Sequence, residues 1–209
     1  MVYGKTKEEQ IQLNEDTVYY GGPRNRNNPD ALKNLPQVRK LIKEGKLSEA
    51  QELARISMTG IPRYTCPYQP LADLFLRFSD HNGSIKDYKR ELDLEEAIVR
   101  VQYMIDERMY TREYFSSAVD QVNVVRITCD KKDMVSLDIN LMRRPFDPGT
   151  KVLSNNRIMM KGKCGDDGIE FCTIVQVLAE GEGKIRTVGD CIRVENADAV
   201  TVFVAAQTN

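Results

Sequence analysis

Apolar and polar side chains alternate with a period of two along much of the chain from about residue 71 onward. The clearest runs are residues 99–105, 135–141 and 200–204, where apolar residues and tyrosine occupy every second position. This period is typical of β-strands with one buried face. Turn-forming clusters divide the runs, at residues 130–133, 166–168, 181–183, 189–190 and 196–198. Many short strands separated by turns, with no helices between them, predict a mainly β fold: an antiparallel β-sandwich of the super-sandwich type.

Two segments near the N-terminus follow a helical period instead. In residues 35–42 and 47–58 the apolar side chains recur at spacings of three and four, and Gly45 separates the two runs. Ser48 and Gln51 form a capping-box pattern that predicts the start of the second helix. We therefore expect two or three short helices, inserted at about residues 30–58 into a single β-sandwich domain of residues 1–209. These helices are expected to cover one flank of the sheet.

Charge and hydropathy exclude several classes of protein. The 209 residues include 30 basic and 31 acidic side chains, so the near-neutral chain gives no electrostatic reason to bind nucleic acid or an anionic membrane. No apolar run approaches the roughly 20 residues that span a bilayer. The first residues lack a charged segment followed by an apolar one, so they do not form a signal peptide. If the chain is complete, we expect a cytoplasmic protein.

The sequence gives little support for a metal site, a redox site or a cofactor-binding site. The five cysteines are odd in number and none forms a Cys-x-x-Cys pair, which argues against a disulfide framework or a zinc site. The Gly181–Lys184 segment is a hairpin turn and lacks the spacing of a phosphate-binding loop. We therefore expect no cofactor and no metal site.

Two polar loops are expected to be solvated. His81, the single histidine, lies in the turn-like segment Ser79–Gly83, which predicts an exposed loop histidine. The loop Arg143–Gly149 begins with two arginines and contains two prolines, and it is the one linker candidate in the chain.

Candidate site residues concentrate between positions 14 and 28. A short apolar run ends at Leu13 and a polar turn follows, then two tyrosines, a Gly-Gly-Pro corner and a loop rich in arginine and asparagine. Asparagine and aspartate bond their own backbone and glycine accepts positive φ, so this composition predicts rigid turns. The residues we assign to an interdomain surface or pocket rim are Asn14, Glu15, Asp16, Thr17, Tyr19, Gly21, Gly22, Pro23, Arg24, Asn27 and Asn28.

This stretch resembles the N-terminal β-sandwich domain of glycoside hydrolase family 95, the inverting α-L-fucosidases and their α-L-galactosidase relatives. The resemblance rests on the Ile11–Thr17 strand and turn, the Gly21–Pro23 corner and the helix start at Asn27–Ala31. It continues in order through residues 35–42, 69–74, 88–94, 110–113 and 195–201. The resemblance implies that the chain is part of a larger enzyme whose catalytic (α/α) barrel follows it.

The resemblance also implies that no catalytic residue lies in this chain, because the general acid and the base of the family belong to the barrel. The residues agree, since inverting hydrolysis needs two carboxyl groups about 6.5–9.5 Å apart. Glu15 and Asp16 are adjacent and would point to opposite faces of a strand. We therefore expect the site residues to brace the barrel or to line the rim of its pocket, with a fucosylated or related glycan bound through the parent enzyme.

A free-standing carbohydrate-binding module is the alternative interpretation. Such modules stack sugar rings on exposed tryptophan or tyrosine, and this chain has no tryptophan. Tyr19, Tyr64, Tyr68 and Tyr88 remain as aromatic candidates.

Strand signals start at Met1 and stop at Ala206, which resembles a domain taken from a longer chain. We expect the strand around Val2 to present an unpaired edge, and the barrel-facing surface near Tyr19 and Tyr20 to be uncovered. Both features predict self-association of the fragment, with mobility in the Arg24–Asn28 loop.

Overall fold

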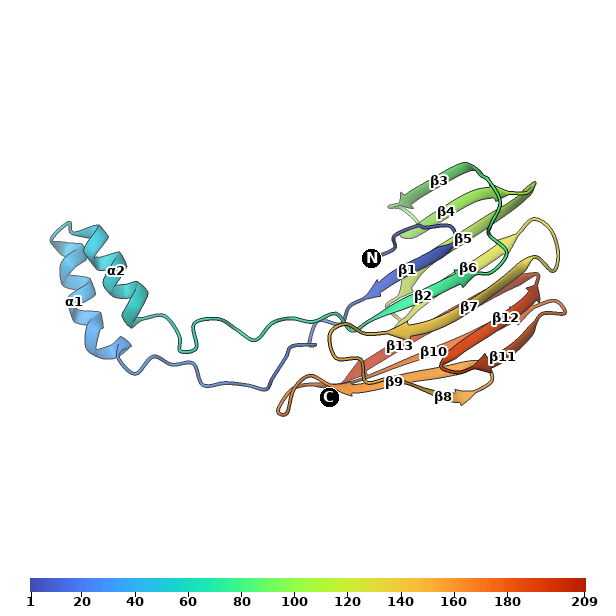
Figure 1. Ribbon diagram of the computed structural model, residues 1–209. Helices are drawn as coiled ribbons and strands as arrows, with labels where there is room; N and C mark the ends of the chain where they lie inside the picture. Colours follow the sequence, from blue (N-terminus) through green and yellow to red (C-terminus); the bar gives the residue numbers. More distant parts are fainter.

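Two antiparallel sheets face each other in the computed structural model, which describes residues 1–209 (Figure 1). The five-stranded sheet has the order β1 (Glu8–Leu13), β2 (Ala72–Phe78), β7 (Val135–Met142), β12 (Cys191–Ala197) and β11 (Lys184–Val188). The eight-stranded sheet has the order β3 (Ile85–Asp93), β4 (Ile98–Ile105), β5 (Arg108–Ser117), β6 (Val122–Cys129), β13 (Ala199–Thr208), β10 (Glu170–Glu180), β9 (Arg157–Lys163) and β8 (Thr150–Ser154). The predicted mainly β sandwich is confirmed.

The alternating residues form the core. In β4 the side chains of Val101, Tyr103 and Ile105 point inward and are buried, and the residues between them are half-buried. β7 and β13 behave in the same way, and both sheets contribute to one cluster of 31 buried apolar residues. The period of two therefore identified the buried face correctly, because successive strand side chains point to opposite faces of a sheet.

A buried ion pair crosses between the sheets at the β1 edge. Glu9 on β1 and Arg112 on β5 are both fully buried, with 3.5 Å between Oε2 of Glu9 and Nη1 of Arg112. The Glu9 carboxylate also accepts hydrogen bonds from the backbone N–H of Gly4 and from the Tyr114 hydroxyl. Arg112 donates to the carbonyl oxygen of Lys5 at 2.9 Å. This network connects the first residues of the chain to both sheets.

His81 is not solvated, and the prediction from its turn-like sequence is wrong. Only 4% of the residue is exposed, and its ring lies against Phe78, Tyr103 and Tyr110. Nδ1 lies 3.0 Å from Asp80 Oδ1, and Nε2 lies 3.0 Å from the Tyr103 hydroxyl. Burial raises the pKa of Tyr103 to about 12, so this hydroxyl keeps its proton at neutral pH. The turn therefore folds back over the aromatic end of the core.

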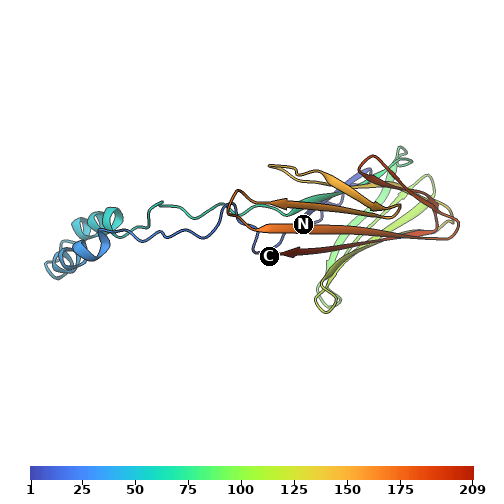
Figure 2. The ribbon, with the colours of Figure 1, turned by 90° about the horizontal axis from the view of Figure 1, so that it is seen from below.

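The two helices do not cover the sandwich. α1 (Ala31–Lys43) and α2 (Leu47–Ser57) pack on each other at the tip of an arm, and two extended segments connect them to one end of the sandwich (Figures 1 and 2). The expected packing on one flank of the sheet is therefore wrong. The capping box is also absent, because α2 begins after Lys46 and no side chain caps it. Neither helix is long and apolar enough to cross a bilayer.

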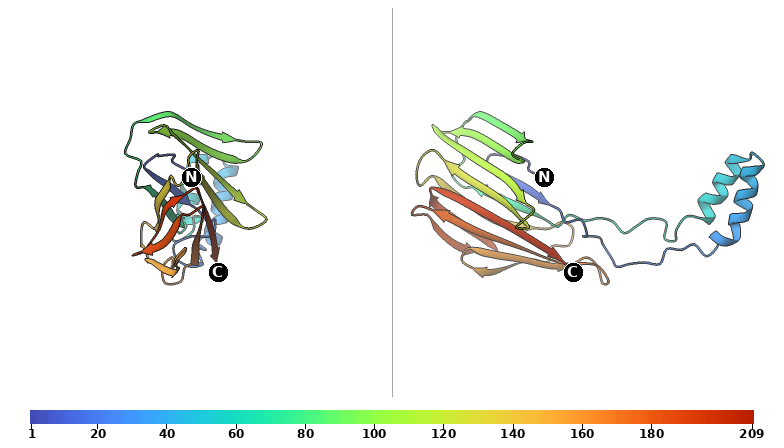
Figure 3. Two further views of the ribbon diagram at one scale, coloured as in Figure 1. Left: turned by 90° about the vertical axis from the view of Figure 1, so that its right-hand side faces the viewer. Right: turned by 180° about the vertical axis from the view of Figure 1, so that it is seen from behind.

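The C-terminus lies at the same end of the sandwich as the arm, as the view from behind shows (Figure 3). At the other end of the chain, Val2 forms an isolated bridge with Ile11, so the outer edge of β1 is paired over a few residues. Self-association and mobility of the Arg24–Asn28 loop stay predictions.

Candidate functional site

The Gly-Gly-Pro corner sits where the arm leaves the sandwich, in a region we call the arm root: residues 14–23, 66–69, 143–149 and 164–168. Its backbone is held from two sides. The N–H of Gly21 donates to the Cys164 carbonyl at 2.6 Å, and the N–H of Tyr20 donates to the Pro67 carbonyl at 3.0 Å. A Cβ atom on Gly22 would collide with the carbonyl oxygen of Asp167, so only glycine fits there. The corner is therefore locked onto the 164–168 loop.

Two aromatic pairs lie on the surface of the arm root. The rings of Tyr19 and Tyr68 meet edge to face with 5.3 Å between centroids, and those of Tyr20 and Phe146 lie 6.0 Å apart. All four residues are exposed, from 37% for Tyr20 to 68% for Phe146. Aromatic side chains exposed together in this way are typical of surfaces that bind a partner or a sugar.

A buried arginine organises the loop beneath these rings. Arg143 donates from Nη2 to Gln69 Oε1 at 2.7 Å, and from Nη1 to the carbonyl oxygens of Pro145 and Phe146. Its guanidinium lies 4.8 Å from the ring centroid of Phe171. The prediction of a solvated basic loop is therefore wrong for Arg143, although Arg144 beside it is exposed. Arg143 fixes the position of Phe146 and so shapes the arm root.

The Asn14–Thr17 turn closes on itself. Glu15 accepts hydrogen bonds from the backbone N–H and the hydroxyl of Thr17, at 2.8 and 2.6 Å. The Tyr68 hydroxyl donates to the Glu15 carbonyl, and the hydroxyl oxygens of Thr17 and Thr208 lie 2.7 Å apart. Asn14 and Asp16 are exposed. The Glu15 carboxylate therefore shapes the turn.

The remaining predicted positions follow the corner into the arm. Pro23 and Arg24 begin the first extended segment and are exposed. Asn28 lies farther along, where its side chain donates to the Thr59 carbonyl at 3.0 Å and accepts from the N–H of Asp30 at 3.0 Å. Asn27 donates its backbone N–H to the side chain of Asn25. The residues predicted to form one site therefore lie in two separate regions, the arm root and the base of the helical hairpin.

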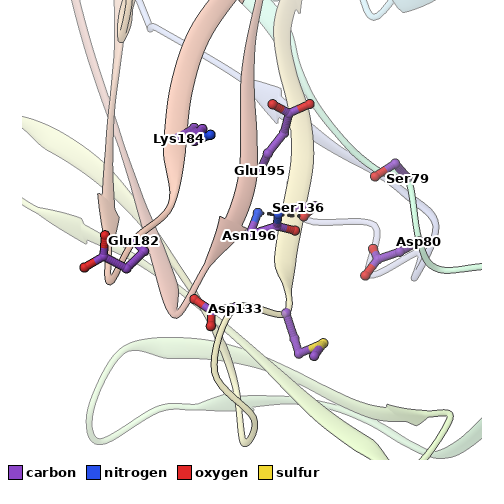
Figure 4. A pocket seen from close by; sticks show the side chains of 9 residues that line it. Ser79, Asp80, Asp133, Ser136, Glu182, Lys184, Glu195 and Asn196 are labelled. Atoms are coloured by element: carbon purple, nitrogen blue, oxygen red, sulfur yellow. Dashed lines mark hydrogen bonds between the residues drawn. The ribbon is translucent and has the colours of Figure 1, made fainter.

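An acidic depression of about 660 Å³ lies at the opposite end of the sandwich (Figure 4). Four carboxylate residues and one lysine line it, together with Ser79, Met134, Ser136 and Asn196. The charged residues are Asp80, Asp133, Glu182, Glu195 and Lys184. Hydrogen bonds from Arg186 lower the pKa of Glu195. Partial burial acts to raise the pKa of Asp80, but the hydrogen bond with His81 and the nearby Arg108 cation outweigh it and keep this pKa low.

These two carboxyl groups are therefore ionised at neutral pH, whereas the acid in inverting glycoside hydrolysis must carry a proton. No group of three His, Cys, Asp or Glu residues is placed to hold a metal ion.

The burial of the charged residues Glu9, Arg112 and Arg143 was not predicted from the sequence. The strand period could have indicated that the first two are buried. Glu9 lies two positions from the buried Ile11, and Arg112 lies two positions from the buried Tyr110, so each points to the same face of its strand as a core residue. A charged residue in the inward register of a strand predicts a buried, paired charge. Arg143 lies in a loop, where no periodicity could have indicated its burial.

Comparison with known proteins adds independent information. The whole chain, residues 1–209, matches the family described as "Glycosyl hydrolase family 65, N-terminal domain". The chain is also 29% identical over 232 aligned residues to the protein named Alpha-L-fucosidase 2 from Arabidopsis thaliana. That alignment covers 100% of the chain and 27% of the plant protein, so the chain spans about a quarter of this relative's length.

Proposed function

The chain belongs to the family of glycosyl hydrolase family 65 N-terminal domains, and from this membership we propose that it is the non-catalytic N-terminal domain of an α-L-fucosidase-like enzyme. The resemblance to a glycoside hydrolase N-terminal domain is confirmed by both comparisons. The parent reaction we propose is the hydrolysis of a terminal α-linked L-fucose, or of a close relative, with inversion. The domain braces the catalytic barrel and adds to the rim of its substrate pocket.

The features of the arm root are the main support for this proposal. It combines a backbone locked by hydrogen bonds with four exposed aromatic side chains, Tyr19, Tyr20, Tyr68 and Phe146. Interdomain surfaces within one chain combine such anchors with polar groups, and ligand pockets favour domain boundaries. The arm root also lies beside the last strand, as the contact between Thr17 and Thr208 shows. A catalytic domain joined to β13 would therefore begin next to this surface.

We expect residues 1–209 alone not to hydrolyse aryl α-L-fucosides above background, because they assemble no acid–base carboxyl pair. The measurement is release of nitrophenol by the purified chain. The control is the full polypeptide of the proposed parent enzyme, which should be active. Turnover by the 209 residues that is lost when one of their carboxylates is replaced would overturn the proposal.

The second candidate function is a carbohydrate-binding module, which the exposed Tyr19–Tyr68 and Tyr20–Phe146 pairs favour. We expect no sugar binding tighter than about millimolar, or about −4 kcal/mol, because the chain has no tryptophan and its paired rings meet edge on or tilted. NMR titration of the chain with L-fucose and fucosylated oligosaccharides measures this affinity. Saturable shifts at Tyr19 and Asn27 below that concentration would favour the binding module.

A further inference from the structure

The helical hairpin at the tip of the arm has little of its own to hold it together. The only apolar residues that α1 and α2 bury between them are Val38, Leu41 and Ala50, and Leu53, Ala54 and Met58 pack around this cluster. The 13 and 11 residues of these helices are short enough to be marginal in water without packing against another surface. The sandwich does not supply that surface, since the hairpin stands away from it (Figure 2).

Apolar side chains on the hairpin face outward. Leu32 is 80% exposed and Ile56 is 59% exposed, and Ile42 and Leu47 are also exposed. A shallow groove of about 690 Å³ runs along α1, and Leu32 and Leu35 line it together with Pro36, Arg39, Lys40, Lys43 and Glu44. Exposed apolar groups beside a groove, on helices that need further packing, indicate a docking surface.

The charge of the arm indicates the character of the surface that it meets. Residues 23–67 contain nine basic and four acidic side chains, whereas the rest of the chain contains 21 basic and 27 acidic ones. α1 alone has four basic residues and no acidic residue. A basic helix with apolar groups complements an apolar surface that is rimmed by carboxylates.

The position of the chain end distinguishes between the surfaces that the arm could meet. The last strand, β13, ends beside the arm root, where Thr208 contacts Thr17. The plant relative is almost four times as long as the aligned region, so a chain of similar length would place a large domain next to the arm. A domain covalently joined at this point is present at high effective concentration next to the arm, whereas a second copy of the chain is not.

We propose that the α1–α2 hairpin is a clamp that docks on an acidic-rimmed apolar surface of the catalytic domain in the same polypeptide. Leu32 and Ile56 supply the apolar contacts to this surface. Arg39, Lys40 and Lys43 pair with the carboxylates that rim it on the catalytic domain. This inference rests on the proposed function and adds a second contact to the one at the arm root. It also explains why the sandwich carries a long arm whose helical hairpin does not pack on the sheets (Figure 2).

Hydrogen–deuterium exchange of the full polypeptide and of residues 1–209 tests the docking. We expect the backbone amides of α1 and α2 to exchange at least about 100-fold more slowly in the full polypeptide, because docking buries apolar groups that are otherwise exposed. Leu32→Asp in the full polypeptide should remove this protection. Leu94→Asp is the matched control, because Leu94 is 82% exposed on the sandwich, and it should leave the protection unchanged. Equal, fast exchange of the hairpin in both proteins would overturn the proposal.

Carbodiimide cross-linking identifies the partner, because it joins lysine to a carboxylate only on contact. We expect Lys40 and Lys43 to couple to carboxylates beyond residue 209 of the same polypeptide, in the monomer band. Coupling to the acidic sandwich of a second copy, in the dimer band, would overturn the proposal in favour of arm exchange. Arg39→Glu/Lys40→Glu should weaken the docking, whereas Lys131→Glu/Lys132→Glu in the β6–β7 turn should not.

Fucosidase activity separates the two proposals. An active full polypeptide with an unprotected hairpin would overturn the clamp and keep the proposed function. A protected hairpin that couples to residues beyond 209 in a polypeptide without glycosidase activity would keep the clamp and overturn the proposed function.

Discussion

Replacing Arg112 by methionine should lower the free energy of unfolding of the domain by about 3–5 kcal/mol. The substitution keeps much of the side-chain volume next to Phe78 and Tyr103, but it leaves the fully buried Glu9 carboxylate without a cation. It also removes the donor to the Lys5 carbonyl. An unpaired charge in the interior is among the most destabilising single changes, because burial strips the ion of its hydration. Urea unfolding followed by circular dichroism measures the loss.

Two further variants separate the charge effect from the loss of packing. Adding Glu9→Gln to Arg112→Met removes the unpaired charge, so the double variant should be more stable than Arg112→Met alone. Arg186→Met breaks a pair with Glu195 that lies on the surface, and this should cost less than about 1 kcal/mol. A loss below about 1 kcal/mol for Arg112→Met would show that the Glu9–Arg112 pair does not hold the β1 edge in place.

Replacing Arg143 by methionine should cost about 2–3 kcal/mol and should loosen the arm root. Gln69 Oε1 loses a charged donor, and the carbonyl oxygens of Pro145 and Phe146 lose the group that orders their loop. Because Phe146 packs against Tyr20, the loop and the Gly-Gly-Pro corner should loosen together. Urea unfolding measures the first effect, and hydrogen exchange of residues 143–149 measures the second.

Arg144→Met is the matched control for this prediction, because the neighbouring arginine is exposed and forms no hydrogen bond or ion pair. It should change the free energy of unfolding by less than about 0.5 kcal/mol. Equal effects of the two substitutions would contradict the role assigned to Arg143.

The sequence alone was sufficient for the clearest strands and for both helices of this domain. Residues 99–105 and 135–141 lie in β4 and β7, where the alternating apolar side chains are buried from Val101 and from Val135 onward, and the helical spacings lie in α1 and α2. These patterns are reliable because a strand repeats every two residues and a helix every 3.6, so a buried face imposes its period on the sequence. The Gly-Gly-Pro corner was predictable for a similar local reason, since Gly21 adopts φ +80°.

Tertiary structure decided which surface each element meets. The apolar face of α1 showed that the helix packs on something, but periodicity carries no information about the partner, and the partner is α2 and not the sheet. His81 and Arg143 lie in loops whose composition predicts solvation, yet an aromatic cluster and the Gln69 side chain enclose them. These contacts join residues that lie far apart in the sequence, so no local pattern records them.

In the candidate site, too, the sequence predicted the local structure and the tertiary structure decided where each residue lies. Tyr19 and Asn28 are nine positions apart and belong to one polar stretch of sequence, but an extended backbone advances about 3.3 Å per residue and separates them along the arm. The sequence thus determined which residue types build rigid turns and exposed anchors. Only the fold decided that one group lies at the arm root beside β13 and the other at the base of the hairpin, because long-range pairing of strands sets where the chain leaves the sandwich.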